Sequence, residues 1–426
     1  MQVFISDLHL TDGTSGQTIN HGAFEVFRDN LEILVGSILK KGKVQDLKIV
    51  LLGDIFDVIR STQWIDAGDN VRPWSEAGPG QNKVLLNIVK AIFQNPENKK
   101  SLSCLADLRE FADREGLGFE LQYVIGNHDW PINRYADCRQ EVATALGMPD
   151  AEMAPLFPTE VFDPAYRTLA RHGDIYDEFN YSGNRGKSSL GDAVVIDLLD
   201  RFPLEVEEPL TALVAEKEIT PEQKKDIVAD LRELDNVRPV FDAPSWVLMI
   251  SDKAGNDGVR QVLEDTWERQ VDALFRIPFI RDMNIPLWPD ATDKLRAVLQ
   301  LCSHTSTWVL EVLAGLKTRF FPTGPEGPYL KKAFAEDKVR SCEADYVIYG
   351  HTHHHLVAPL DHIRLNKGCR DMIYFNTGTW RQTWNKVTLD KIHREFVGWK
   401  VLSYASFYRK EENNEYNFEV WNGALG

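Results

Sequence analysis

Pairs of acidic and histidine residues recur along this sequence, each directly after a short apolar run. Asp54, for example, follows Ile49–Gly53 in the stretch KIVLLGDIFD. The side chains that could bind a metal are Asp7, His9, Asp54, Asn127, His172, His351 and His353. Carboxylates, imidazoles and one amide oxygen suit divalent manganese, iron or zinc. Because the set holds no cysteine, it disfavours a closed structural zinc site.

Seven ligands are too many for one ion, but they suit two ions that share a carboxylate. Such ions lie roughly 3.5–4 Å apart and clamp both oxygens of an in-line displacement at phosphorus. Each residue alone also has a simpler interpretation: Asp7 and Asp57 could cap a turn, and a lone histidine at a strand end is usually a satisfied, partly buried one. Four separate strands end in such residues, and this joint occurrence favours a metal site.

The apolar runs indicate buried strands that position these side chains. A run bounded by glycine is typical of a strand in a parallel sheet, and ligands collect at the carboxyl edge of such sheets. Gln2–Ser6 and Lys48–Leu52 are two of these strands, and the helical spacing of apolar residues in Phe24–Leu39 predicts an amphipathic helix between them. The sequence therefore predicts an α/β fold that opens with a β-α-β unit.

After this unit, the predicted strands and helices alternate at first, and the pattern then becomes mainly helical. Further strands are expected at Leu121–Ile125, Tyr166–Arg171, Asp345–Tyr349, Met372–Phe375 and Val397–Tyr404. Helices are expected at Asn82–Gln94, Leu102–Glu115, Ala193–Leu199, Leu210–Glu216, Pro221–Leu234, Val259–Phe275 and Lys294–Lys317, with a long loop at Ser61–Gln81. We expect a core of residues 1–190 and 340–426, and a helical insertion of residues 191–339 that could cap the site.

The composition and net charge of the chain disfavour some classes of function. The 426 residues carry a net charge of −16, which disfavours nucleic acid as a partner because polyanion binding needs a basic surface. The five cysteines form no CxxC pair and fit reduced thiols in a cytoplasm. We see no signal peptide and no apolar run long enough for a transmembrane helix, so we expect a cytoplasmic protein without integral membrane association.

In order and spacing, these residues resemble the calcineurin-like metallophosphoesterase superfamily. The resemblance rests on Asp7-x-His9, Gly53-Asp54-x-x-Asp57, Gly126-Asn127-His128-Asp129, His172 and Gly350-His351-x-His353. It implies a four-layered α/β/β/α sandwich with a dinuclear metal site at its strand ends, whereas the large helical insertion has no counterpart in the resemblance. One ion would take Asp7, His9, Asp54 and His353, and the other Asp54, Asn127, His172 and His351. The implied cofactors are two divalent ions, manganese first, with iron or zinc as alternatives.

The resemblance also implies a function: a dimetal-dependent phosphoester hydrolase in which a metal-bridging hydroxide attacks phosphorus. His128 matches the proton donor, Asp129 would orient it, and Asp57 would have a supporting role. The expected substrate is a phosphodiester, pyrophosphate or phosphomonoester of a small molecule, with Arg185 and Lys187 as candidate phosphate contacts. The Asp-Leu-His-Leu start and His172-Gly173-Asp174 look like the UDP-2,3-diacylglucosamine pyrophosphohydrolase branch. That branch tends to carry arginine at the position of His128 and a shorter lid, so its substrate is not carried over.

Two alternatives remain open from the sequence. A manganese-dependent nuclease would use the same ligands, although the net charge of −16 disfavours it. A non-catalytic metal-binding scaffold on the same fold would be expected to lack the proton donor or several ligands, and here all are present. The sequence does not indicate the oligomeric state.

Overall fold

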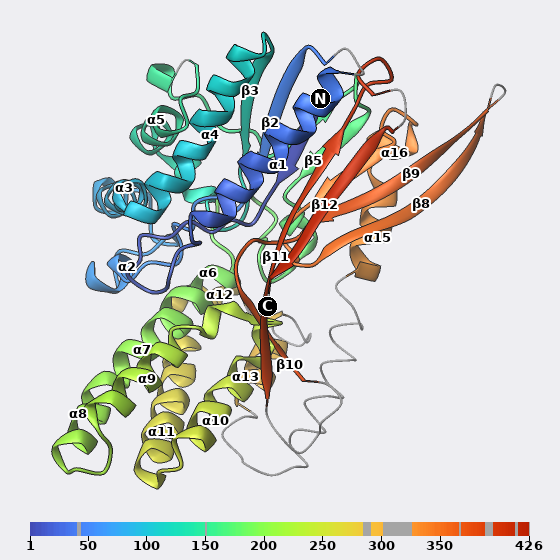
Figure 1. Ribbon diagram of the computed structural model, residues 1–426. Coiled ribbons are helices and arrows are strands. Elements are labelled where there is room, and N and C mark those ends of the chain that lie inside the picture. Colours follow the sequence, from blue (N-terminus) through green and yellow to red (C-terminus); the bar gives the residue numbers. More distant parts are fainter. Residues whose placement is uncertain are drawn as a thin grey trace.

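The computed structural model describes residues 1–40, 44–149, 151–283, 291–300, 326–365, 368–387, 395–413 and 416–425. Over these residues the chain forms a mixed α/β fold with two β-sheets, helices on their outer faces and a separate group of helices at one end (Figure 1). This agrees with the predicted α/β class. None of the described helices is long and apolar enough to cross a membrane.

The first sheet has the strand order β3-β2-β1-β11-β10-β6, with β12 paired to β11. Strands β1, β2 and β3 are parallel, as the β-α-β pattern predicted, and β11 runs antiparallel to β1. The bounds are β1 Gln2–Ile5, β2 Asp46–Leu52, β3 Gly118–Val124, β6 Val237–Arg238, β10 Thr383–Lys386, β11 Phe396–Phe407 and β12 Phe418–Leu425. Strand β6 belongs to the region expected to be helical, so the insertion also contributes to this sheet.

The second sheet has the order β4-β5-β7-β9-β8. Strands β5, β7 and β9 are parallel, and β4 and β8 are antiparallel edge strands. The bounds are β4 Glu160–Asp163, β5 Thr168–Arg171, β7 Tyr346–Tyr349, β8 His355–Leu365 and β9 Gly368–Thr377. The strand patterns at 166–171, 345–349 and 372–375 are therefore confirmed, whereas β4, β8, β10 and β12 were not predicted.

Apolar side chains join the two sheets face to face. Phe4, Val50 and Val124 of the first sheet form one buried cluster with Ile348 and Phe375 of the second. Helices cover the outer face of the first sheet, and two others cover that of the second (Figure 1). Their bounds are α1 Gly22–Leu39, α3 Pro79–Gln94, α4 Pro96–Arg114 and α5 Ala136–Ala145 for the first sheet, and α15 Glu326–Ala335 and α16 Asp337–Arg340 for the second.

The insertion is mainly helical, as predicted. Its helices are α6 Leu190–Val194, α7 Arg201–Glu205, α8 Glu207–Ala215, α9 Pro221–Leu231, α10 Ala243–Ala254, α11 Asp257–Leu274, α12 Pro278–Met283 and α13 Ala291–Gln300. The helix expected at Lys294–Lys317 lies outside the described residues beyond Gln300. The expectation of one continuous loop at Ser61–Gln81 is wrong, because α2 (Gln63–Asp66) forms within it and α3 already begins at Pro79. Trp64, fully buried, anchors α2 to the core.

Candidate metal centre

The parallel strands bring all seven predicted ligands to one place. Strand β1 ends just before Asp7 and His9, β2 just before Asp54, and β3 just before Asn127. In the other sheet, β5 ends just before His172, and β7 ends just before His351 and His353. Because parallel strands end at the same edge, ligands far apart in the sequence meet where the two sheets adjoin. The predicted convergence of Asp7, His9, Asp54, Asn127, His172, His351 and His353 is thus observed.

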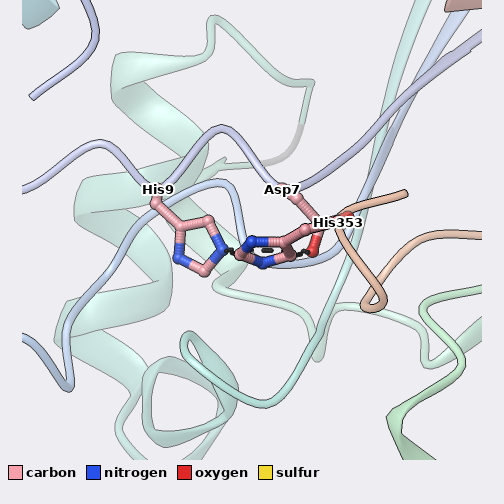
Figure 2. Close-up of side chains that lie close together, drawn as sticks. All are labelled: Asp7, His9 and His353. Carbon is pink, nitrogen blue, oxygen red and sulfur yellow. Dashed lines mark hydrogen bonds and ion pairs between the residues drawn. The ribbon is translucent and has the colours of Figure 1, made fainter. Parts of the chain in front are cut away.

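Asp7, His9 and His353 form the first ligand group, shown in Figure 2. Nε2 of His9 lies 3.1 Å from Nε2 of His353, which in turn lies 3.4 Å from Oδ1 of Asp7. Nε2 of His9 is 3.9 Å from the same Asp7 oxygen. The side chains of Asp7 and His9 are fully buried. Three ligand atoms facing one another at these separations can surround a cation.

Asp54, His172 and His351 form the second group, and Asn127 joins it. Nε2 of His172 lies 3.1 Å from Oδ2 of Asp54 and 3.2 Å from Oδ1 of Asn127, and Nδ1 of His351 lies 2.9 Å from the same amide oxygen. Oδ2 of Asp54 also lies 3.8 Å from Nε2 of His9. Asp54 therefore lies between the two groups, where a shared ligand would have to be.

The backbone at the ligands is strained. Asp7, His9, Asp54, His351 and His353 all have φ between 46° and 68°, in the left-handed region that non-glycine residues rarely adopt. Such strain persists only where the surroundings fix it, and it clusters at functional sites. Hydrogen bonds fix it here: the amide of His9 donates to the carbonyl of Asp54 at 2.9 Å, and the hydroxyl of Thr379 donates to the carbonyl of Asp7 at 2.6 Å.

Close packing at one glycine helps to place Asp54. A Cβ atom at Gly126 would overlap Oδ1 of Asp54 and come within 2.7 Å of its amide nitrogen. Oδ1 accepts a hydrogen bond at 2.8 Å from the amide of His128, two residues after this glycine. The Gly-Asn-His sequence after β3 thus allows the two strand ends to approach each other closely.

The buried carboxylates and imidazoles shift one another's pKa values. Burial raises the pKa of Asp7. Burial would also raise that of Asp54, but the charges of His172, His128 and His9 outweigh it and hold the pKa of Asp54 well below its usual range. Burial would lower the pKa of His172, yet the carboxylates of Asp54 and Asp7 raise it to about 10. The centre therefore favours ionised Asp54, which suits binding of a cation.

Asp57 connects the ligands to the predicted proton donor. Its Oδ1 lies 2.8 Å from Nδ1 of His128 and its Oδ2 lies 2.9 Å from Nδ1 of His9. Burial opposes the charged imidazolium of His128, but the carboxylates of Asp57 and Asp54 raise its pKa well above the usual value. His128 is therefore held in a form that can donate a proton, and Asp57 fixes its ring.

The expectation that Asp129 orients His128 is wrong, because Asp57 takes that place. Oδ2 of Asp129 accepts hydrogen bonds from the hydroxyl of Tyr123 at 2.6 Å and the amide of Ile55 at 3.0 Å, and Oδ1 accepts one from the amide of Gly126 at 2.6 Å. Burial and the charge of Asp54 raise the pKa of Asp129 to about 7. Asp129 thus holds together the backbone after β2 and β3.

The sequence did not point to two residues that contact the ligands. Oδ2 of Asp177 lies 3.0 Å from Nε2 of His351, the nitrogen that faces away from Asn127. Nε of Arg238, in the insertion strand β6, donates to Nδ1 of His353 at 3.1 Å. Neither stands at a recognisable sequence spacing from its histidine. The only signal for Asp177 is its place five residues after His172, and the sequence holds none for Arg238.

The insertion also meets the core beneath the site. Oδ2 of Asp235 lies 3.3 Å from Nη1 of Arg381 and 3.4 Å from Nη1 of Arg60, and all three side chains are buried. Nη1 of Arg381 lies 3.7 Å from Oδ2 of Asp57. An acid of the insertion thus connects, through one arginine, to the carboxylate that holds His9 and His128.

Arg185, one of the two candidate phosphate contacts, has a partner in the protein. Both of its Nη atoms contact the carboxylate of Asp174, and Nη1 lies 3.3 Å from the carbonyl oxygen of Gly126. Its guanidinium is therefore occupied by the loop that follows His172. Lys187 is exposed.

The donor chemistry fits a divalent ion in each ligand group. Each group combines imidazole nitrogens with a carboxylate oxygen, and its ligand atoms all lie within 4.8 Å of one another. Paired nitrogen and oxygen ligands of this kind suit manganese, iron or zinc. Set at a buried sheet edge and held by a strained backbone, these clusters define an α/β protein whose His and Asp residues could hold metal ions. In comparisons with known proteins, no family model matches this chain and no curated protein matches it.

Proposed function

We propose that this protein is a dimetal-dependent hydrolase of phosphoester bonds in small molecules, on a calcineurin-like metallophosphoesterase fold. The observation that carries the proposal is the meeting of seven ligands from five strand ends around Asp54. Two ligand groups that share one carboxylate are the arrangement that phosphoryl displacement by two metal ions requires.

The layers of the fold support the proposed four-layered α/β/β/α sandwich. Two sheets share an apolar interface, α1, α3, α4 and α5 cover one outer face, and α15 and α16 cover the other (Figure 1). The helical insertion would form a second unit joined at β6. Helices α15 and α16 lie within the expected insertion of residues 191–339 but pack on the second sheet, so the core would begin again at Glu326 and not at residue 340.

The ions would be divided as the two ligand groups suggest. Asp7, His9 and His353 would hold one ion, Asn127, His172 and His351 the other, and Asp54 would contact both. Manganese is the first choice for a mixed carboxylate and imidazole set, with iron or zinc as alternatives. Two divalent cations bound there would polarise a phosphoryl oxygen and lower the pKa of water for attack on phosphorus.

The chain's own residues would then handle the leaving group. Against the effect of burial, the carboxylates of Asp57 and Asp54 raise the pKa of His128 and so favour its charged form, and 14% of its side chain is accessible. Asp57 fixes Nδ1 of its ring, so Nε2 is the nitrogen left to donate a proton to the departing oxygen. Asp57 also fixes Nδ1 of His9, which leaves Nε2 of His9 as a ligand atom.

The net charge of the chain and the position of the insertion both favour a small substrate. A chain with a net charge of −16 repels long polyanions, and Arg238 and Asp235 of the insertion lie next to His353 and Arg381. The insertion would therefore restrict the approach to the centre and act in substrate choice.

A panel of phosphate esters tests this function. Protein loaded with Mn²⁺, Fe²⁺ or Zn²⁺ is assayed on phosphomonoesters, phosphodiesters, pyrophosphates and single-stranded DNA at two salt concentrations. We expect hydrolysis of small esters, and loss of at least about 100-fold in turnover with retained metal in His128→Ala. Cleavage of DNA alone would favour the nuclease. Metal binding without hydrolysis of any substrate would favour the scaffold and overturn the proposal.

A further inference from the structure

Arg238 stands out among the arginines near the centre because no acidic side chain of the described residues pairs with it. Arg60 and Arg381 each pair with Asp235, and Arg185 pairs with Asp174. Arg238 has only neutral acceptors among the described residues: its Nη1 donates to the carbonyls of Asp235 at 2.6 Å and Val237 at 3.0 Å, and its Nε donates to His353.

This cation is only partly satisfied where it lies. Arg238 is half-buried, and among the described residues no carboxylate forms an ion pair with it. A cation that is partly removed from water costs free energy unless an anion compensates for it. The position therefore has the electrostatic character of an anion site whose anion is supplied from outside.

The guanidinium is also oriented for an incoming ligand. The two carbonyl contacts hold Nη1, at the far side of the group. Nε and Nη2 form the opposite edge, the fork that matches two oxygens of a phosphate. Only Nδ1 of His353 contacts this edge among the described residues.

Binding of a cation by His353 would free that edge completely. Nε of Arg238 is a donor only, so in the present contact Nδ1 of His353 is the acceptor and Nε2 carries the proton. When His353 uses Nε2 as a metal ligand, its proton belongs on Nδ1, and Arg238 can no longer donate to it. Both N–H groups of the fork then become available next to the centre.

We propose that Arg238 binds a phosphoryl oxygen of the substrate and selects a terminal phosphate over a phosphodiester. This rests on the proposed hydrolase function and names its substrate class. A terminal phosphate has three non-bridging oxygens, so it can meet two cations and still offer one oxygen to Arg238. A diester has only two such oxygens, so the guanidinium must share an oxygen that a cation already binds, which weakens its contact.

Inorganic phosphate and dimethyl phosphate are the probes, titrated by calorimetry into the full-length, Mn²⁺-loaded protein. We expect Arg238→Ala to weaken phosphate binding by about tenfold or more and dimethyl phosphate binding by less than about twofold, with unchanged metal content. Arg238→Lys should recover part of the loss. Arg232→Ala is the matched control, because that arginine lies in the same insertion with its side chain 44% exposed and paired to Glu207.

The outcomes separate this inference from the hydrolase function. If the wild type hydrolyses monoesters, while Arg238→Ala keeps its phosphate affinity and its KM for them, the role of Arg238 is overturned and the hydrolase stands. If no ester is hydrolysed, while Arg238→Ala still loses phosphate affinity, the anion site stands and the hydrolase does not. Absence of phosphate binding by the wild type, or an equal loss for both probes in either Arg238 variant, also contradicts the role of Arg238.

Discussion

The carboxylate of Asp57 lies 2.8 Å from Nδ1 of His128, at the far side of the imidazole from Nε2. We expect Asp57→Asn to lower kcat by about 100-fold on alkyl phosphates, because the neutral amide no longer stabilises the charged imidazole. Aryl phosphates with acidic leaving groups need less proton donation and should lose less. Steady-state kinetics on both substrate types measures the difference.

Asp129→Asn is the matched comparison for that variant. Its carboxylate bonds Tyr123, Ile55 and Gly126, so the substitution should lower the thermal midpoint without distinguishing between the two substrate types. A stronger dependence on the leaving group in Asp129→Asn than in Asp57→Asn would return the orienting role to Asp129.

We expect Asp177 to strengthen the binding of one of the two ions. Its Oδ2 lies 3.0 Å from Nε2 of His351, and carboxylates that hold a ligand histidine in this way typically contribute 10- to 100-fold in metal affinity. Asp177→Asn should therefore weaken one of two binding steps by about that factor in a calorimetric Mn²⁺ titration. Asp113→Asn, at an exposed position on α4, is the control. Two unchanged binding steps would remove Asp177 from the site.

Loss of Asp54 should affect both ions together. Its Oδ2 lies 3.1 Å from Nε2 of His172 and 3.8 Å from Nε2 of His9, one in each ligand group. Asp54→Asn should remove activity and reduce the bound metal by more than one ion per chain, measured by elemental analysis after dialysis. Asp66→Asn, exposed on α2, should keep both. Retention of full activity and metal in Asp54→Asn would exclude a shared ligand.

Asp192 should make stability depend on pH. Its buried carboxyl accepts from the indole of Trp130 at 3.1 Å, and burial raises its pKa from 3.8 to about 6. A carboxyl whose pKa is raised on folding contributes stability that is fully present below about 3.8 and is lost as the pH rises through about 6. The loss is on the order of 3 kcal/mol.

Asp192→Asn should lack this loss, so its thermal midpoint relative to the wild type should improve between pH 5 and pH 8. Both proteins are compared by calorimetry at the two pH values. If the difference in thermal midpoint between the variant and the wild type is the same at both pH values, Asp192 has an ordinary pKa in the folded protein.

The strand-end residues could be predicted because their pattern is local. An apolar run followed by Gly-Asp or Gly-Asn-His indicates both the strand and the side chain at its end, and parallel pairing then brings the ends together. The helical character of residues 191–283 was equally readable from its spacing. Strands β4, β10 and β12 were not, since short or edge strands carry weak periodicity.

The contacts around the ligands could not be predicted in the same way. Asp129 follows His128 directly, yet its carboxylate turns back to Gly126 and Tyr123, while Asp57 reaches His128 across 71 positions. Arg238 reaches His353 only because β6 joins the first sheet beside β10. Adjacency in sequence does not determine contact in space, and the long-range pairing of β6 has no signature in its two residues.

The central claim is a centre of two cations that share Asp54. A crystal of the wild type grown with Mn²⁺, with anomalous differences collected at the manganese edge, tests it most directly. We expect two peaks roughly 3.5–4 Å apart, with Asp54 in contact with both, one beside His9 and His353 and the other beside His172 and His351. A single peak, or peaks away from these strand ends, would contradict the claim.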